Sequence, residues 1–497
     1  MQDKTGLNDA QSRVVEHAGS HLLVTAGPGT GKTHTLTLRA ARLAGQMTDA
    51  RKILLVTFTN RAAGELQSRL ALIAPDHVDR FQIGTFHSLA AGILRRYGHL
   101  RGLCADFSVT LPEEIETLAK DFPARDPSVS PGDLVLRMSR FKARVDSSID
   151  DPQAKAFAVF LRTAGHLDFD DILRETVFLL RENPGICREV ALAFAHVCVD
   201  EYQDVSSVQE ALLLCLSAQG VLLTVIGDPD QSIYGFRGAG PEYFERFNKL
   251  FAPCTVLRLE VNYRCARRIV SASSAVIASG PRFEHAAFPE AFSRVEGELS
   301  VFEAPTARAE ARYIARSIRE FSGNSGFSLS GGEGGYTFAD MAVLYRLNAQ
   351  AVLLAQELEA CGLPCRIFGS ESEPNGRADV YQARVEKISL MSMHAAKGLE
   401  FPVVILAGCE SFLLPVSLQG FSGDVNEERR LFYVGMTRAR ELLLITYSRC
   451  RPLWGQILNS APSPFLCEIP SGLFTVRCLP PERNRRVEAR AQLKLFG

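Results

Sequence analysis

Short apolar runs alternate with amphipathic segments along most of the chain. The runs LLVT (22–25), KILLVTF (52–58) and AFAHVCV (193–199) have the length and β-branched content of buried strands. Segments with the apolar spacing of helices lie between such runs, for example THTLTLRAARLA (33–44). Strands that alternate with helices favour a parallel sheet covered by helices. We therefore predict an α/β fold whose ligands bind at the carboxyl ends of the strands.

The pattern changes twice, and each change marks a domain boundary. From about Gly98 to Leu180, helices separated by Pro, Asp and Ser breaks replace the strands, which indicates a helical insertion. From Val261 onwards, strand-like runs such as GELSVFEA and MAVLYR again alternate with helical ones, which predicts a second lobe. The expected divisions are a first lobe of 1–97 and 181–260, an insertion of 98–180, a second lobe of 261–470 and a tail of 471–497.

The composition is that of a globular protein without a strong overall charge. Hydrophobic residues make up 46% of the 497 residues, and 55 basic and 56 acidic side chains leave a net charge of −1. A nucleic-acid partner would therefore have to be held by a local groove. The first residues lack the apolar stretch of a signal peptide, and no run approaches the length of a membrane span. The twelve cysteines form no CxxC pair, which favours buried thiols in a reducing cytoplasm over zinc or disulfides.

The stretch LLVTAGPGTGKT (22–33) has the layout of a phosphate-binding loop. A strand leads into a glycine-rich turn and a helix begins directly after it, so that backbone N–H groups and the helix dipole surround an anion. Lys32 would reach the β- and γ-phosphates of a nucleotide, and the Thr33 hydroxyl would hold Mg²⁺. The expected nucleotide-binding loop consists of Ala26, Gly27, Pro28, Gly29, Thr30, Gly31, Lys32 and Thr33.

Ala26 takes the position of the first glycine in this pattern, which is a departure from its strict form. The alternative interpretation is an ordinary glycine-rich turn between a strand and a helix. The order of strand, loop, GKT and helix disfavours that alternative.

Two later segments complete a nucleotide site. An apolar strand ends in Asp200 and Glu201, where Asp200 would hold Mg²⁺ through water and Glu201 would orient or deprotonate the attacking water. The next strand ends in GDPDQSIY, which places Gln231 near the γ-phosphate. Upstream of the loop, Gln11 could pair with adenine through its amide, although a helix N-cap at Asn8 explains the same residues.

Polar and aromatic residues follow two other predicted strands. Thr57, Phe58, Thr59 and Asn60 come after the run KILLV, and Thr85, Phe86 and His87 end the segment FQIGTFH. Hydroxyls and amides suit phosphate and sugar contacts, and aromatic rings could stack on bases. Capping of the following helices is the alternative for each of these residues taken alone.

Eight short motifs occur in the chain in a fixed order. They read TAGPGTGKT, VTFTNRAAGEL, GTFHSLA, VDEYQD, IGDPDQSIYGFRGA, LEVNYR, MSMHAAKGLEF and FYVGMTRAR. In this order they resemble the motif series of the UvrD/Rep/PcrA group of superfamily 1 DNA helicases, up to about Pro470. The resemblance implies two RecA-like lobes of the P-loop NTPase class with ATP between them, and ATP-driven 3′→5′ movement along single-stranded DNA.

The resemblance also assigns roles to individual residues. Gln11 would select adenine, Tyr263 would stack on it, and Glu400 would contact the sugar of the nucleotide. Arg264 and Arg438, both from the second lobe, would act as arginine fingers. The residues that would hold Mg·ATP, activate water or sense the γ-phosphate are Lys32, Thr33, Asp200, Glu201 and Gln231.

The same resemblance predicts which residues line the DNA track, and the chain departs from the family at three points. Phe236 replaces the usual tryptophan, so that stacking should survive with less area, and Pro464 stands where relatives often carry arginine. Relatives also insert a large helical domain in the second lobe, where this chain has only a short loop at 370–387. We therefore expect a compact translocase whose duplex handling is reduced or supplied by a partner. The expected DNA-track residues are Phe58, Asn60, Thr85, His87, Tyr234, Phe236 and His394.

The chain ends in QLKLF, which resembles the short peptide by which bacterial DNA enzymes dock on the sliding clamp. The residues of this expected contact are Gln492, Leu493, Leu495 and Phe496. An apolar terminus that packs onto the second lobe is the alternative. We predict a cytoplasmic, ATP-dependent DNA helicase of repair or replication, monomeric or weakly self-associating. The alternatives are a translocase that strips proteins from single strands, and a clamp-tethered DNA-binding ATPase switch.

Overall fold

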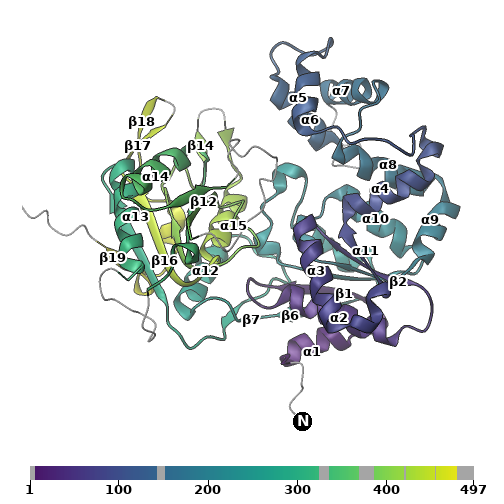
Figure 1. Ribbon diagram of the computed structural model, residues 1–497, viewed down its shortest axis with the longest axis horizontal. Coiled ribbons are helices and arrows are strands. Elements are labelled where there is room, and N and C mark those ends of the chain that lie inside the picture. Colours follow the sequence, from purple (N-terminus) through teal and green to yellow (C-terminus); the bar gives the residue numbers. More distant parts are fainter. Residues whose placement is uncertain are drawn as a thin grey trace, which may run out of the picture. The chain divides into compact units, whose positions relative to one another are not determined.

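The computed structural model describes residues 6–142, 151–323, 335–368, 386–418, 421–453 and 455–477. Within these residues the chain forms two compact units, each with its own parallel sheet (Figure 1), so the predicted α/β class is confirmed. The first unit comprises Met1–Arg264 and Gly280–Ser293, and the second comprises Cys265–Ser279 and Arg294–Gly497.

The first unit is built on a six-stranded sheet with the order β3-β2-β4-β5-β1-β6. Every neighbouring pair is parallel, so the carboxyl ends of the strands lie along one edge. In this order β4 and β5 separate β1 from β2, the strand that follows it in the chain. The strands are β1 (His21–Ala26), β2 (Lys52–Thr57), β3 (Phe81–Thr85), β4 (Phe194–Val199), β5 (Leu222–Gly227) and β6 (Cys254–Leu259).

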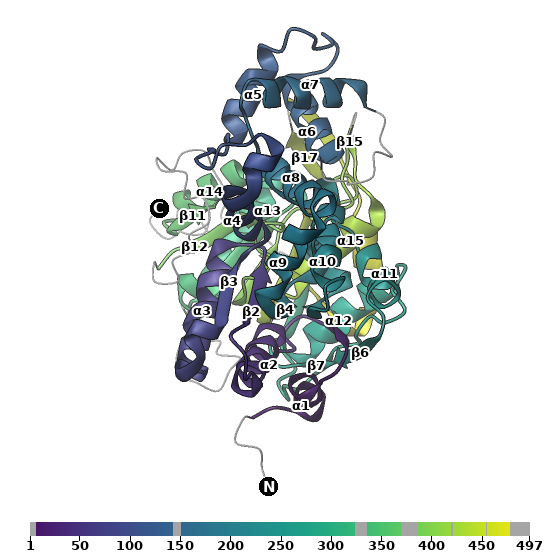
Figure 2. The ribbon, with the colours of Figure 1, turned by 90° about the vertical axis from the view of Figure 1, so that its right-hand side faces the viewer.

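Alternate residues of these strands enter two different cores. On β1, Leu22 and Val24 pack with residues of α1 and α2, whereas Leu23 joins a larger core on the opposite face. Because both faces are buried, the strands are continuously apolar rather than alternating. Figure 2 shows α2 and α3 on one side of the sheet and α9 and α10 on the other. The covering helices are α1 (Asp9–Glu16), α2 (Lys32–Gln46), α3 (Asn60–Ile73), α4 (Phe86–Tyr97), α8 (Phe169–Glu182), α9 (Pro184–Leu192), α10 (Ser207–Ser217) and α11 (Glu242–Leu250).

Three further helices of the first unit gather around a small core of their own (Figure 1). They are α5 (Pro112–Lys120), α6 (Pro131–Lys142) and α7 (Pro152–Thr163), and they bury Phe122 and Phe157 between them. At the end of α6, the buried ammonium of Lys142 lies 2.7 Å from carboxylates of both Asp168 and Asp171. These ion pairs join α6 to the start of α8, which itself packs against α4.

The second unit contains a seven-stranded sheet with the order β11-β12-β10-β13-β16-β9-β19, in which all neighbours are parallel. Its strands are β9 (Glu298–Ala304), β10 (Met341–Tyr345), β11 (Cys365–Ile367), β12 (Ile388–Ser392), β13 (Phe401–Leu406), β16 (Ala439–Ser448) and β19 (Thr475–Arg477). Two short antiparallel pairs accompany it, β14 (Ser417–Leu418) with β15 (Phe421–Ser422) and β17 (Cys450–Leu453) with β18 (Gln456–Asn459).

Helices α13 (Ala307–Phe321) and α14 (Ala349–Ala360) pack on the main core of this sheet. Helices α12 (Arg267–Ala278) and α15 (Val425–Met436) pack on each other and on β16, and the short α16 (Pro464–Cys467) follows. A buried ion network ties the ends of β13 and β16 to α13. The guanidinium of Arg451 contacts Glu310 and Glu410, and the Glu310 carboxylate also accepts hydrogen bonds from Gly408 N and Thr446 Oγ1.

The boundary between the units follows spatial contacts rather than chain order. The chain enters the second unit after Arg264, returns with Gly280–Ser293 and leaves again. We call Gly280–Ser293 the strap. Its strand β8 (Glu290–Ala291) pairs with β7 (Val261–Asn262), and Asn262 Nδ2 donates a hydrogen bond to the carbonyl of Pro28 at 2.9 Å. The predicted boundary at Val261 therefore falls inside the first unit.

The described cysteines are free thiols. Among the residues that the structure describes, no helix is long and apolar enough to cross a membrane. The predicted short loop of the second lobe falls almost entirely, and the QLKLF peptide entirely, outside the described residues.

Candidate nucleotide-binding site

The glycine-rich loop leaves β1 and returns the chain at Lys32 as the start of α2, as the sequence predicts. Gly29 and Gly31 have φ of +67° and +81°, a region in which a side chain is strained. A Cβ at Gly29 would lie 2.5 Å from the Cβ of Arg264, so glycine is also required there for space. The Lys32 ammonium donates to the carbonyls of Ala26 and Gly27, both at 3.2 Å. This ammonium is therefore held across the loop, where phosphates would bind.

The start of α2 meets the end of β4 through one hydrogen bond. The Thr33 hydroxyl donates to Oδ2 of Asp200 at 2.9 Å. Burial, reinforced by the neighbouring charge of Glu201, raises the pKa of Asp200 to about 7, although Thr33 and Lys32 act in the opposite direction. A nearby cation stabilises the ionised form of a buried carboxyl whose pKa is raised. A hydroxyl beside such a carboxylate is a donor set that suits Mg²⁺, so these residues fit the predicted metal.

Glu201 has a strained backbone conformation. Its φ of 53° and ψ of 43° place it in the left-handed region, and it is the one non-glycine residue with positive φ in the described chain. This turn redirects the chain after β4, so that Glu201 follows Asp200 at the carboxyl edge of the sheet. Gln203 donates a hydrogen bond from Nε2 to the Glu201 carboxylate, and its Oε1 accepts the N–H of Asp228 at 2.9 Å.

Gln231 lies in the short turn after β5, buried beside Asp228. Its Nε2 donates to Oδ2 of Asp228 at 2.6 Å, and its N–H donates to the Asp228 carbonyl. Burial raises the pKa of Asp228, while the Lys32 charge lowers it. Lys32 is therefore electrostatically coupled to the acidic side chains at the ends of both β4 and β5. The sequence motifs contain Asp228 and Gln203, but their roles in holding Gln231 and Glu201 were not predicted.

Gln11 is committed to protein contacts. Its Oε1 accepts the N–H of Asn8, its N–H is capped by Asn8 Oδ1, and its Nε2 donates to the Thr30 carbonyl at 3.1 Å. The cap at Asn8 is thus confirmed, and it joins α1 to the glycine-rich loop. The role of Gln11 in adenine selection stays a prediction, and this geometry requires that its Nε2 exchange the Thr30 carbonyl for the base.

Tyr263 lies beside the same loop and is 40% exposed. Its N–H donates to the Gly29 carbonyl, and its hydroxyl accepts a hydrogen bond from Asn8 Nδ2 at 2.8 Å. The ring of Phe292 from the strap lies 4.9 Å from the Tyr263 ring, centroid to centroid. An exposed ring pair next to a phosphate loop can accept a flat base. Phe292 had no sequence signal, because only the pairing of β7 with β8 brings it there.

Arg264 belongs to the first unit, whereas the sequence predicts it in the second lobe. Its backbone N–H donates to Oδ1 of Asn262 at 2.8 Å, and its Cβ covers Gly29. Asn262 is buried and bridges the loop and Arg264 through its two amide atoms. The residues next to Asn262 were singled out from the sequence, whereas its own bridging role was missed.

The expected DNA-track residues of the first unit lie at or just beyond the carboxyl ends of its strands. Phe58 follows β2 and its ring lies 5.9 Å from that of Phe86, while Tyr234 and Phe236 follow β5 with rings 6.0 Å apart. Phe236 is 40% exposed, but Phe86 is only 1% exposed. The prediction that a base could stack on Phe86 is therefore wrong, because its ring lies in the core.

Thr59 and Thr85 cap the helices that follow their strands, as the alternative interpretation proposed. Asn60 is the exposed first residue of α3. His87 is half-buried, and burial lowers its pKa, so its imidazole is neutral at pH 7. The exposed ring of Phe169, at the start of α8, lies 5.6 Å from the His87 ring at 87°. The sequence pattern did not reveal Phe169, since the contact joins two distant segments.

The second unit carries the remaining predicted residues. Arg438 is 2% exposed, and its guanidinium donates to the carbonyls of Val434 at 3.0 Å and Leu399 at 3.1 Å. The Glu400 carboxylate lies 3.8 Å from the guanidinium of Arg440, and His394 is half-buried in the turn after β12. The roles of these residues in nucleotide or DNA binding stay predictions. Gln492, Leu493, Leu495 and Phe496 lie outside the described residues.

Comparison with known proteins assigns nearly the whole chain to one family. Residues 7–252 match the UvrD/REP helicase N-terminal domain, and residues 257–372 and 374–450 match the UvrD-like helicase C-terminal domain. The chain is 28% identical to ATP-dependent DNA helicase UvrD1 of Mycobacterium leprae, covering 95% of this chain and 86% of the relative. It is 25% identical to ATP-dependent DNA helicase PcrA of Staphylococcus aureus, covering 94% and 87%.

The alignment with the Mycobacterium leprae relative spans 683 positions, more than the 497 residues of this chain. The relative therefore carries extra segments that this chain lacks. The match to the C-terminal domain is interrupted at residue 373, inside the predicted short loop. On the strength of both domain matches, the chain belongs to the UvrD-like helicase family.

Proposed function

We propose that this protein is an ATP-dependent DNA helicase that hydrolyses ATP as it moves 3′→5′ along single-stranded DNA. The observation that carries the proposal is the contact of Thr33 with Asp200 at the mouth of the glycine-rich loop. It joins the first helical turn after the loop to the acidic end of β4, the arrangement that a phosphate-binding site with a metal requires. The names of the relatives, ATP-dependent DNA helicases, support the same activity.

Each residue of the site has a chemical task in this proposal. The loop N–H groups and the Lys32 ammonium bind the β- and γ-phosphates of ATP and exchange the present carbonyl contacts of Lys32 for phosphate oxygens. Thr33 and Asp200 would hold Mg²⁺. The bound ion would offset the negative charge of the phosphates and stabilise the ionised form of the buried Asp200 carboxyl. Glu201 orients the attacking water and accepts its proton. Gln231, held by Asp228, contacts the γ-phosphate. Arg264 and Arg438 are proposed as arginine fingers.

The adenine ring is proposed to lie against Tyr263 and Phe292, and Gln11 to read its edge. Glu400 is proposed to contact the ribose. A single strand of DNA is proposed to follow the carboxyl edge of the first sheet. There Tyr234 and Phe236 offer exposed or half-buried rings, and Phe58, Asn60, Thr85 and His87 lie at the ends of β2 and β3. His394 of the second unit is proposed to contact the same DNA strand. Stacking of this kind tolerates any sequence.

The short loop predicted at 370–387 of the second lobe favours a translocase whose unwinding of duplex is reduced or depends on a partner. The length difference from the relatives supports this interpretation. We further propose a role in DNA repair or replication in the cytoplasm, as a monomer or weakly self-associating protein. The C-terminal QLKLF is proposed to dock on the sliding clamp. Strong unwinding of long duplexes by the purified chain would contradict the first of these points, and clamp binding that survives deletion of residues 492–496 would contradict the last.

The deciding experiment compares ATP hydrolysis with and without single-stranded DNA. The wild type is expected to turn over ATP faster when an oligonucleotide is added, and Lys32→Ala is expected to lose this turnover. Lys52→Ala is the matched control, because Lys52 is exposed at the amino end of β2, opposite the proposed site. Equal turnover by the wild type and Lys32→Ala would contradict the proposal. DNA-stimulated hydrolysis without directional movement would instead favour an ATPase switch.

A further inference from the structure

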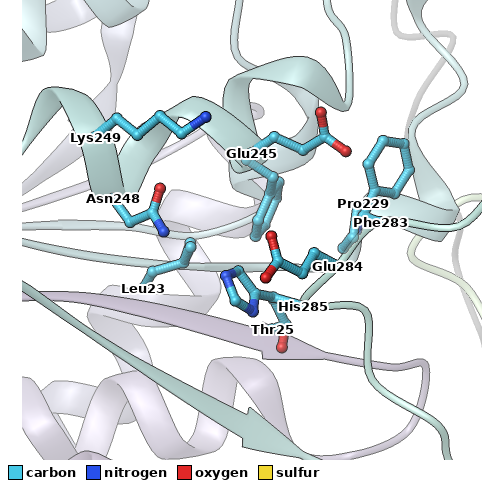
Figure 3. A pocket seen from close by; sticks show the side chains of 10 residues that line it. Leu23, Thr25, Pro229, Glu245, Asn248, Lys249, Phe283, Glu284 and His285 are labelled. Atoms are coloured by element: carbon cyan, nitrogen blue, oxygen red, sulfur yellow. The ribbon is translucent and has the colours of Figure 1, made fainter.

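A cavity of about 180 Å³ lies in the first unit, on the face of β1 opposite α2 (Figure 3). Leu23 and Thr25 of β1 line it together with the buried ring of Phe244 from α11. Figure 3 shows Glu245 and Lys249 of α11 on one side and Glu284 and His285 of the strap on the other. None of these residues has a task in the proposed ATP or DNA sites.

Two polar atoms of the cavity lining have no hydrogen-bond partner among the residues that the structure describes. They are Oγ1 of Thr25, which is 1% exposed, and Oδ1 of Asn248 on α11. A buried polar atom left without a partner costs about 1–3 kcal/mol, so native proteins usually satisfy it with protein, water or ligand. Asn248 Oδ1 is an acceptor, and the Thr25 hydroxyl can accept as well as donate. A ligand with N–H donors therefore meets the demand of both atoms.

The charged groups at the opening add to this demand. The carboxylates of Glu245 and Glu284 are exposed and form no ion pair with another described residue. The Lys249 ammonium is also unpaired among the described residues, so the opening carries two negative charges against one positive charge. Among the lining side chains the net charge is therefore negative, which favours a cation over an anion, while the guanidinium of Arg258, outside the lining, bonds to the Glu284 carbonyl at 3.1 Å.

The size and apolar surface of the cavity limit the body of a ligand. An engineered apolar cavity of about 150 Å³ holds benzene, so a cavity of about 180 Å³ has room for one ring with a small substituent. Leu23, Phe244 and Phe283 supply apolar and aromatic surface for such a ring. Aromatic faces also attract cationic groups.

We propose that this cavity is a binding site for a small organic cation, an amidinium or protonated amine carried on a ring-sized apolar body. The cation donates hydrogen bonds to Thr25 Oγ1 and Asn248 Oδ1, and the carboxylates of Glu245 and Glu284 offset its charge. The ring lies against Leu23 and Phe244. The site is separate from the glycine-rich loop, which the same strand reaches after Ala26.

The test titrates the full-length protein with benzamidine, benzoate and benzyl alcohol, which share a ring and differ in charge. Calorimetry and ligand-observed NMR are expected to show saturable binding of benzamidine, with benzoate weaker by roughly tenfold because of the two carboxylates. Saturating ADP is expected to leave benzamidine binding unchanged. Benzoate binding as tight as benzamidine, no saturable binding of any probe, or displacement of benzamidine by ADP would each overturn the proposal.

Matched variants test whether benzamidine binds in this cavity rather than elsewhere on the protein. Glu284→Gln is expected to weaken benzamidine binding about threefold, whereas Glu290→Gln, exposed on the same strap but outside the lining, is expected to leave it unchanged. Asn248→Asp adds a carboxylate and is expected to tighten binding, and Thr25→Val keeps the shape of a β-branched residue while removing a partner. Equal effects of Glu284→Gln and Glu290→Gln, or wild-type affinity in both Asn248→Asp and Thr25→Val, would overturn the assignment. Thermal unfolding of each variant shows that it is folded.

Discussion

The hydroxyl of Thr33 donates a hydrogen bond to Asp200 across 2.9 Å, joining residues 167 positions apart. Because β4 and β1 are separated by β5 alone, the end of one strand faces the first helical turn after the other. This contact brings the proposed metal-binding hydroxyl and carboxylate together at the mouth of the glycine-rich loop.

We expect the hydroxyl of Thr33 to matter for turnover more than its methyl group. Thr33→Val removes the hydroxyl and is expected to lower ATP turnover at least about 100-fold through loss of the metal ligand. Thr33→Ser keeps the hydroxyl and is expected to retain most of the turnover. DNA-stimulated ATPase assays over a range of magnesium concentrations measure both. Equal losses in the valine and serine variants would show that the hydroxyl alone does not sustain turnover, and would contradict its role as a metal ligand.

The raised pKa of Asp200 predicts how stability depends on pH. This pKa rises from an ordinary value of 3.8 to about 7 in the folded protein, so the folded state binds the proton more tightly. The resulting contribution to stability is complete below about pH 4 and is lost as pH rises through about 7. Without magnesium or nucleotide, urea unfolding at pH 5 and pH 8 is therefore expected to show a larger loss for the wild type than for Asp200→Asn.

Asp76→Asn, an exposed change in the same unit, controls for the general effect of removing a carboxylate. Because the neighbouring charge of Glu201 acts on Asp200, the measured transition belongs to both carboxyls rather than to one. The wild type and Asp200→Asn could instead lose the same stability between these pH values. That result would show that burial does not raise the pKa of the Asp200 carboxyl.

Local motifs were readable from the sequence because strand, turn and helix are contiguous there. The glycine-rich loop, the cap at Asn8 and the apolar strands all follow from short-range pattern. Phe292 beside Tyr263 and Phe169 beside His87 depend on tertiary contacts between segments far apart, so no local signal marked them. The interpretation of Phe86 failed for a related reason, because an aromatic residue after a strand can turn either outward or into the core.

The strap shows the same limit at the level of domains. The strand–helix pattern restarts at Val261, which predicts a boundary there, whereas the spatial division follows strand pairing. The pairing of β7 with β8 keeps the strap on the first unit. Pro289 of the strap also lies close to the glycine-rich loop, since a Cβ placed on Gly27 would be 3.3 Å from the Cβ of Pro289. Neither contact involves a residue type that sequence pattern would single out.

The strained backbone of Glu201 allows two effects of this residue to be measured separately, one on stability and one on ATP turnover. Its φ of 53° is accessible to glycine without strain, so Glu201→Gly is expected to remove about 1 kcal/mol of strain and to abolish turnover. Glu201→Gln keeps the strain and side-chain size and is also expected to lose turnover, while nucleotide binding persists. Urea unfolding and fluorescent-nucleotide binding measure the two effects. If the glycine variant is less stable than the glutamine variant, the backbone at position 201 is not strained. If the glutamine variant has normal turnover, Glu201 is not the base.

Phe236 provides the sharpest test of the proposed DNA track. Its ring is 40% exposed and lies 6.0 Å from that of Tyr234, so truncation should remove stacking without opening the core. Phe236→Ala is expected to weaken binding of single-stranded oligonucleotides by about 1–3 kcal/mol, whereas Phe236→Trp enlarges the ring and is expected to tighten it. Phe288→Ala is the control, since Phe288 is exposed on the strap under the guanidinium of Arg282 and has no place in the proposed track. Fluorescence anisotropy with labelled oligonucleotides at fixed salt measures all three, because phosphate contacts make affinity depend on salt. If Phe288→Ala and Phe236→Ala weaken binding equally, the loss comes from the fold rather than from stacking, and the DNA does not follow this edge of the sheet.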